Sequence, residues 1–358
     1  MKFFDKELLF VLVLFCAGLG CFLWNNNMSG LTLVIAIVLF VAGLIFLIKG
    51  GDWFVDGATA IAEKFKIPEV LIGATIVSIG TTLPEVMVSA QAAAKGASAI
   101  SYGNAIGSII CNVSLIAAIT LAVKPAVINR KPLVVPVIFF FVAAAFYCFN
   151  AYVTQEYTRT TGFILLAIFA IYMTVQIVQA LKKKGDNTQQ TIEADDAEEK
   201  PAMNMGKAIV LLVFGAAIIT FGATLLVDNG QFIAQAVGVP ESVIALIFVA
   251  LGTSLPELVT AITSLAKGHG ALSVGNIIGA NLFNLVLVSG LAITINPFNL
   301  PNDKQIAGMN ASLIVDIPLA MLVMLILTVP ALTKSKLYRW QGILLLALYV
   351  GFCIFQFA

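Results

Sequence analysis

The chain has 358 residues, of which 60% are hydrophobic and only 11% are charged. Soluble domains carry about 25% charged residues, so this composition excludes a water-soluble fold and indicates a chain that lies in a lipid bilayer. The formal net charge of +1 provides no basic surface, and we therefore expect no nucleic-acid partner.

Eleven stretches are apolar and long enough to cross a membrane, which takes about 20 residues of helix. In chain order they are 7–24, 31–63, 68–95, 98–123, 132–152, 158–181, 206–238, 240–268, 271–295, 311–332 and 337–357. The charged segment Lys182–Lys200 separates the sixth stretch from the seventh, and its composition predicts a flexible linker outside the membrane. The sequence thus predicts an all-α polytopic membrane protein with about 11 transmembrane helices.

The distribution of cations predicts the orientation. If the N-terminus is cytoplasmic and the chain crosses eleven times, 16 of the 20 Lys and Arg residues face the cytoplasm, as the positive-inside rule requires. The C-terminus then lies outside. With no targeting signal recognised, we expect a multi-pass protein of the cytoplasmic (inner) membrane, functional as a monomer, with an oligomer left open.

The two halves of the chain resemble each other. A shift of 172 residues aligns Ile72–Leu115 with Ile244–Leu287 without a gap, and 18 of the 44 pairs are identical. Five predicted spans separate equivalent points, so the second copy enters the membrane upside down, as in many secondary transporters. We expect four parts: an extra N-terminal helix in 1–30, a first inverted repeat in 31–181, a cytoplasmic linker in 182–205, and a second repeat in 206–358.

Each repeat carries one unusual apolar segment, V-S-I-G-T-T-L-P-E at 77–85 and V-A-L-G-T-S-L-P-E at 249–257. Proline lacks an N–H donor and clashes with the carbonyl four residues back, so we expect both helices to break here. A break frees carbonyls near Ser78–Thr82 and Ala250–Ser254. The segments also add the hydroxyls of Thr81, Thr82, Thr253 and Ser254.

The last residue of each segment is an acid, Glu85 or Glu257. A charge at mid-membrane costs at least about 2.5 kcal/mol, so two such acids predict a bound cation. Facing each other, the segments would form an oxygen cage of charge −2, which suits calcium. Neither segment has His or Cys, which disfavours zinc and copper. The alternative is a pair of kinked helices whose acids meet a buried cation such as Lys49.

The following span of each repeat adds a polar stripe. Asn104, Ser108 and Asn112 share one helical face, and the second copy reads Asn276, Ala280 and Asn284. Gly103 and Gly107 would let another helix approach. The stripe predicts ligand or supporting roles for Ser108, Asn112 and Asn284, with interhelical packing as the alternative.

The segments GTTLPE…GNAIGSIICN and GTSLPE…GNIIGANLFN resemble the α-repeats of the cation/calcium exchanger superfamily, most of all its prokaryotic sodium/calcium antiporter branch. The resemblance implies that Glu85 and Glu257 bind calcium with the carbonyls of Thr81 and Thr253. It implies sodium positions formed by the hydroxyls of Thr81, Thr82, Ser108, Thr253 and Ser254 and the carbonyls of Ser78 and Ala250.

The chain also departs from that family. Ala280 replaces a Ser found in several members, Ile109 replaces an expected Asn, and Asn284 stands where some members carry an acid. With these changes, the sequence does not determine whether sodium, potassium or a proton is the counter-ion. The expected function is sodium/calcium antiport by alternating access, with calcium/proton or potassium-dependent exchange as the alternative and a cation channel as a different class. We expect no enzyme activity and no cofactor beyond the transported ions.

Three further acids lie within predicted spans. Asp56 and Asp228 are related by the 172-residue shift, and Asp52 lies one turn before Asp56. Acids inside membrane helices commonly mark ion pathways, so cavity lining or ion attraction is one interpretation. A hydrogen bond near a helix end is the other.

Overall fold

The computed structural model describes residues 33–186, 203–236, 252–302, 305–306 and 308–357, and this part of the chain is almost entirely helical. The first half contains α2 (Leu33–Phe65), α3 (Glu69–Ile72), η1 (Gly73–Val77), α4 (Ser78–Ala94), α5 (Ser98–Cys111), η2 (Asn112–Ala117), α6 (Ala118–Val123), η3 (Lys131–Leu133), α7 (Val134–Phe149), η4 (Asn150–Thr154), β1 (Glu156–Tyr157) and α8 (Arg159–Asp186). All η elements are π-helical turns except η3, which is a 3-10 turn.

The second half repeats much of this order. It contains α9 (Met205–Ala236), α12 (Leu255–Ala266), α13 (Gly270–Phe283), η7 (Asn284–Val288), α14 (Ser289–Ile295), β2 (Phe298–Asn299), β3 (Gln305–Ile306), β4 (Met309–Asn310), η8 (Ser312–Asp316), α15 (Ile317–Lys334) and α16 (Arg339–Phe357). The strands are short and antiparallel: Tyr157 of β1 pairs with Phe298 of β2, and Ile306 of β3 pairs with Met309 of β4.

Nine helical stretches among the described residues are long and apolar enough to cross a membrane. Their bounds agree with the predicted spans to within a few residues; the span predicted at 98–123, for example, is helical from Ser98 to Val123. The polytopic all-helical fold is therefore confirmed. The predicted span 7–24 lies outside the described residues, and of 240–268 only its later part is described, as α12. The count of eleven stays a prediction.

The helices recur at the offset seen in the sequence. Helices α5 and α13 span 98–111 and 270–283, so both their starts and their ends are 172 residues apart. A π-helical turn begins at Asn112 and again at Asn284. Gly96 and Gly268 follow α4 and α12 with φ of 75° and 87°, a conformation that glycine adopts readily. Equivalent sequences thus fold into equivalent local structures.

The expected helix break occurs in only one copy. Thr253 and Ser254 form a turn, and α12 starts at Leu255 with Pro256 in its first turn. In the first copy the prediction was wrong, because α4 runs unbroken from Ser78 to Ala94 with Pro84 inside it. Proline removes a single helical hydrogen bond there, and the irregular turn lies earlier, in η1.

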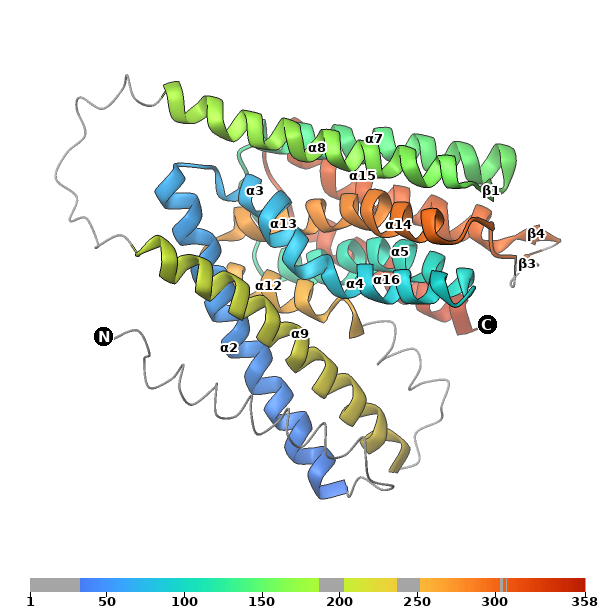
Figure 1. Cartoon of the computed structure of the whole chain (residues 1–358), viewed down its shortest axis with the longest axis horizontal. Helices are drawn as coiled ribbons and strands as arrows, with labels where there is room; N and C mark the ends of the chain where they lie inside the picture. The colour runs from blue at the N-terminus through green and yellow to red at the C-terminus, as the bar shows by residue number, and fades with distance from the viewer. Residues whose placement is uncertain (1–32, 187–202, 237–251, 303–304, 307, 358) are drawn as a thin grey trace.

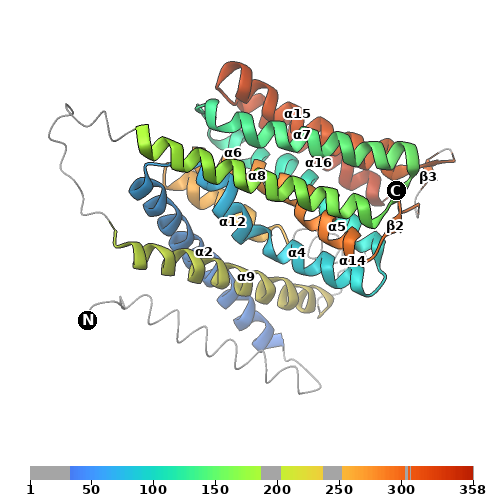
Figure 2. The same cartoon turned by 45° about the horizontal axis from the view of Figure 1, so that its top comes forward.

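Two long helices cross one side of the molecule. Figures 1 and 2 show α2 and α9 lying together, apart from α7 and α15. Glycines bring these two helices close: a Cβ at Gly43 would lie 2.8 Å from the carbonyl oxygen of Gly222, and one at Gly57 would lie 2.6 Å from that of Ala208. Such contacts between small residues are typical of helix packing in membranes.

A second close approach lies at the centre. A Cβ at Gly73 of η1 would lie 2.8 Å from the backbone nitrogen of Asn276 in α13, and one at Gly279 would lie 2.6 Å from the Cα of Ala74. Almost every residue of α13 is buried. For Gly103 and Gly107 no described atom lies within 4 Å of such a Cβ, and the close packing expected there stays a prediction, since 237–251 is not described.

Candidate functional site

The two predicted acids are fully buried. Glu85 lies in α4 and Glu257 in the first turn of α12, and both have an exposed fraction of 0%. Neither oxygen of the Glu85 carboxylate has a hydrogen-bond partner, and neither does Oε2 of Glu257. No Lys or Arg among the described residues forms an ion pair with either acid. A buried carboxylate without a partner is strongly destabilising, so each acid must be neutralised either by a bound cation or by a proton.

The hydroxyls of the two acidic segments lie beside these carboxylates. Thr82 Oγ1 lies 3.5 Å from Oε1 of Glu257, so the first segment contacts the acid of the second. Thr82 and Ser254 are buried, and the Ser254 hydroxyl has no hydrogen-bond partner. Thr253 is half-buried, and Ala250 lies outside the described residues.

Two buried amides add further oxygen atoms without partners. Asn112 and Asn284 have exposed fractions of 0%, and their Oδ1 atoms accept no hydrogen bond. They begin η2 and η7, where η2 packs against α12 and η7 against α4. Each amide therefore lies on a turn that contacts the acidic helix of the other copy. Ser108, one turn before Asn112, is buried as well.

A pair of equivalent hydrogen bonds joins the two halves. Thr81 donates from Oγ1 to Oδ1 of Asn276, and Thr253 donates to Oδ1 of Asn104, both at 3.3 Å. Each bond maps onto the other by the 172-residue shift. Asn104 also donates from Nδ2 to the carbonyl of Glu85 at 3.1 Å. The structure thus brings Asn104 and Asn276 together with the acidic segments, as supports of the two threonines.

Side chains also donate hydrogen bonds to backbone carbonyls of the π-helical turn η1. Ser78 donates from Oγ to the carbonyl of Gly73 at 2.7 Å and contacts the carbonyl of Asn276 at 3.0 Å. Tyr172 of α8 donates to the carbonyl of Ala74 at 2.7 Å. The Ser78 hydroxyl therefore holds η1 against α13, which fixes the start of α4 and the position of Glu85.

Sequence reasoning gave no role to Asn281, which the structure places beside Asn112. Nδ2 of Asn112 donates to Oδ1 of Asn281 at 3.1 Å, and Nδ2 of Asn281 lies 3.2 Å from the sulfur of Met324. These contacts orient the Asn112 side chain with its Nδ2 toward Asn281, and its Oδ1 has no hydrogen-bond partner and can serve as a ligand. Position 109, the equivalent of 281, is Ile, and Asn284 has both amide atoms unpartnered. In the sequence, the role of Asn281 was indicated only by the difference between the two repeats, which have Ile109 and Asn281 at equivalent positions.

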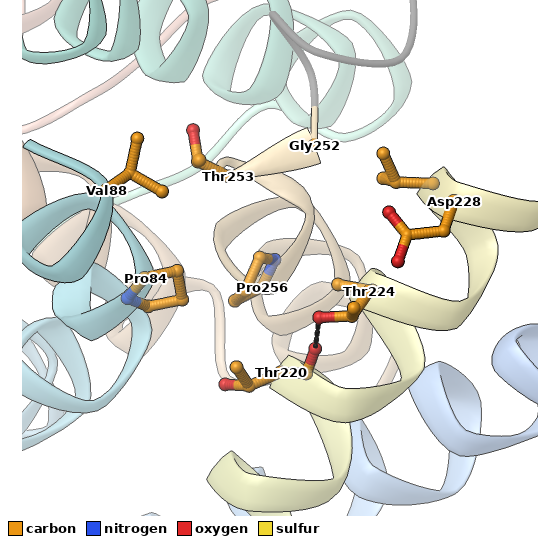
Figure 3. A pocket seen from close by; sticks show the side chains of 10 residues that line it. Pro84, Val88, Thr220, Thr224, Asp228, Gly252, Thr253 and Pro256 are labelled. Atoms are coloured by element: carbon orange, nitrogen blue, oxygen red, sulfur yellow. Dashed lines mark hydrogen bonds between the residues drawn. The ribbon is translucent and has the colours of Figure 1, made fainter. Parts of the chain in front are cut away.

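The three other acids lie apart from the buried carboxylates. Nζ of Lys267 lies 2.7 Å from Oδ1 of Asp56 and 3.3 Å from Oδ1 of Asp52. Asp228 instead lines a cavity of about 250 Å³ between α4, α9 and the start of α12. Figure 3 shows its carboxylate near Thr224, with Pro84 and Pro256 facing each other across the cavity. Thr253 lines it too, so the cavity reaches the acidic segments.

The donor set of the buried cluster consists of oxygen atoms. It contains two carboxylates, the amides of Asn112 and Asn284, and the hydroxyls of both acidic segments. Among the described residues, no group of three or more His, Cys, Asp or Glu side chains is placed so that it could hold a metal ion. Oxygen donors with only two charges suit hard cations such as calcium and sodium rather than zinc or copper.

The profile of the sodium/calcium exchanger protein family matches residues 35–178 and 207–358. The chain belongs to the sodium/calcium exchanger family. The two matched ranges contain the acidic segments and both polar stripes, and the gap between them contains the charged linker. The resemblance inferred from GTTLPE and GTSLPE is thereby confirmed.

Individual relatives agree over nearly the full length. The sodium/calcium exchanger MaX1 of Methanosarcina acetivorans is 30% identical over 354 residues, covering 89% of this chain and 98% of that protein. An uncharacterized membrane protein of Methanocaldococcus jannaschii is 33% identical over 322 residues, covering 89% and 97%. A solved structure of the sodium-calcium exchanger NCX_Mj superposes with a TM-score of 0.72 at 30% identity, covering 89% of this exchanger and 97% of that chain.

Proposed function

We propose that this exchanger moves calcium and sodium in opposite directions across a membrane through one site between Glu85 and Glu257. The observation that carries the proposal is the pair of fully buried carboxylates, of whose four oxygen atoms three have no hydrogen-bond partner. A stable fold needs a counter-charge there, and a transported cation supplies it. Relatives whose names state sodium/calcium exchange support the choice of ions.

The proposed calcium ligands are the carboxylates of Glu85 and Glu257, the carbonyls of Thr81 and Thr253, and the amide oxygens of Asn112 and Asn284. Calcium accepts six to eight oxygens in flexible geometry, which this set can provide. Sodium would use the hydroxyls of the same segments and share the carboxylates. Because the two ions would compete for common oxygens, calcium leaves as sodium arrives, which enforces exchange.

The two halves of this site are unequal. Ala280 is the equivalent of Ser108 by the 172-residue shift and offers no hydroxyl, and Asn284 offers an amide where an acid would make the site more negative. The cage therefore has a charge of −2, which one calcium ion neutralises. A sodium ion bound on that side would therefore have one hydroxyl ligand fewer than a sodium ion bound beside Ser108.

Calcium uptake into proteoliposomes under separate gradients tests the counter-ion. With sodium inside and none outside, we expect rapid calcium uptake, because sodium leaving the vesicle drives calcium in. Potassium or proton gradients of equal size should drive little uptake. Uptake driven equally by a pH gradient would favour the alternative of calcium/proton exchange, and conductance without any coupling would favour a channel.

We further propose the placement of the chain. The count of Lys and Arg supports a cytoplasmic N-terminus, an external C-terminus and the cytoplasmic membrane. The recurrence of helices at the 172-residue offset supports two inverted repeats, in 31–181 and 206–358, joined by the linker 182–205 and preceded by an extra helix in 1–30. One chain contains both halves of the site, so a monomer suffices for exchange, without a cofactor or catalytic chemistry.

A further inference from the structure

An ion pair ties α2 to the end of α12. Lys267 caps the C-terminus of α12. Its Nζ lies 2.7 Å from Oδ1 of Asp56 and donates to the carbonyl of Asp52 at 3.0 Å. The helices are tightly packed beside this pair: a Cβ at Gly51 of α2 would lie 2.6 Å from the side chain of Val259 in α12. On this side the space between the two helices is closed.

The 172-residue shift places the same groups on the other pair of helices. Lys267 maps onto Lys95, which caps the C-terminus of α4, and Asp56 maps onto Asp228 of α9. Asp52 maps onto Thr224. The equivalent contact would therefore join Lys95 to Asp228, between α4 and α9.

That second ion pair is not formed in the structure. Neither Lys95 nor Asp228 has an ion-pair partner among the described residues, and both are exposed. The cavity that reaches Thr253 is lined by Asp228 and by Ala223, the equivalent of Gly51. Figure 3 shows Asp228 and Thr253 in its wall. Where the ion pair is present the two helices are in close contact, and where it is absent a cavity lies between the helices and reaches Thr253.

The position of Lys95 fits a role in closing that cavity. Pro84 and Val88 line the cavity from α4, and Lys95 follows Val88 by seven residues. Residues seven apart share one helical face, about two turns apart. Lys95, the C-cap residue of α4, therefore follows the cavity-lining face of that helix, about two turns beyond Val88.

We infer that Lys267 with Asp52 and Asp56, and Lys95 with Asp228, are two alternating ion-pair latches. Each latch closes one side of the site, and in each access state one is formed and the other is open. The inference rests on the proposed alternation of access between two inverted repeats. The latches are unequal, because the first has two carboxylates and the second has one. We therefore expect the resting chain to favour the state seen here, with the Asp228 side open.

Labelling of a cysteine in the cavity tests the latches. Val88→Cys places a thiol in the cavity wall, and the rate of its modification by a polar maleimide, measured on its own peptide by mass spectrometry, reports how often the cavity is open. Lys267→Gln should lower this rate by about two- to fivefold, because breaking a partly exposed ion pair shifts the equilibrium by a small factor. Lys95→Gln should leave the rate equal or higher.

The two substitutions remove the same charge from equivalent positions, so general damage would move the rate in the same direction for both. Lys64→Gln, an exposed change at the end of α2, serves as the control and should leave the rate unchanged. Exchanging the charges by Lys267→Asp with Asp56→Lys should restore the original rate. An unchanged rate in Lys267→Gln, or an equal loss in Lys95→Gln, would overturn the inference. The readout involves no ion flux, so it fails or succeeds independently of the proposed ions.

Discussion

Replacing Glu85 with Gln is expected to reduce sodium-driven calcium uptake by about 30-fold or more. Removing one partner of a buried charge contact costs about 2–5 kcal/mol, and about 1.4 kcal/mol corresponds to a factor of ten. Gln keeps the size of the side chain but leaves a cage of charge −1 for a divalent ion. Initial rates of calcium uptake into proteoliposomes, normalised to the amount of reconstituted protein, measure the loss.

Stability provides a second readout of the same change. Without ions, the wild-type chain holds an uncompensated carboxylate at Glu85, so Glu85→Gln should melt at an equal or higher temperature than the wild type. Calcium should raise the melting temperature of the wild type by mass action and should have little effect on the variant. Glu63→Gln, an exposed acid near the end of α2, is the matched control. If Glu85→Gln transported calcium at the rate of that control, the site would lie elsewhere.

Replacing Glu257 with Gln should cause a loss of similar size, since Glu257 is equally buried and provides the other charge. The informative result is the double variant. If both acids hold one ion, either single change already abolishes calcium binding, and Glu85→Gln with Glu257→Gln should be no worse than the poorer single variant. Groups that act as one unit commonly behave in this non-additive way.

Two independent calcium sites would give a different pattern. Each single variant would then retain about half of the bound calcium, and only the double variant would lose all of it. Calcium binding to purified protein, measured at equilibrium for the three variants and the wild type, separates these cases. The contact between Thr82 of one segment and Glu257 of the other is why we expect the single-site result.

Much of the fold could be predicted because membrane spans are determined by local composition. The span expected at 98–123 is observed with those bounds. In lipid, backbone N–H and C=O groups must form hydrogen bonds within the protein, and outside a closed β-barrel only a helix achieves this. The internal repeat could also be predicted from the sequence, because matched residues such as Asn112 and Asn284 occupy equivalent positions in the structure, each at the start of a π-helical turn. Glu85 and Glu257 could be identified as site residues because placing a charged side chain at mid-membrane is unfavourable in free energy.

The path of the backbone around Pro84 was not predictable in the same way. The same Gly–Pro pattern gives an unbroken helix at α4 and a turn before α12. Pro84 removes one hydrogen bond inside α4, whereas Pro256 removes none because it lies in the first turn of α12, and tertiary contacts decide whether the helix continues. At α4, the contacts of Ser78 with Asn276 and of Tyr172 with Ala74 hold η1 against its neighbours, and these partners are distant in the sequence.

The role of Asn281 and the pairing of Lys267 were missed for a related reason. Asn281 acts through the amide of Asn112, 169 residues away, and a count of Lys and Arg residues does not indicate that Lys267 pairs with Asp56. Both contacts depend on which helices become neighbours. Periodicity indicates the face of a helix on which a residue lies, and it does not indicate which helix that face meets.

Calcium binding at equilibrium in the presence of graded sodium tests the central claim most directly. Because two carboxylates and the surrounding oxygens form one shared site, we predict one calcium per chain at saturation, displaced completely and cooperatively by sodium. At the calcium concentration that saturates the wild type, Glu85→Gln should bind only a small fraction of that amount. Two calcium ions per chain, or calcium that remains bound at saturating sodium, would contradict the account.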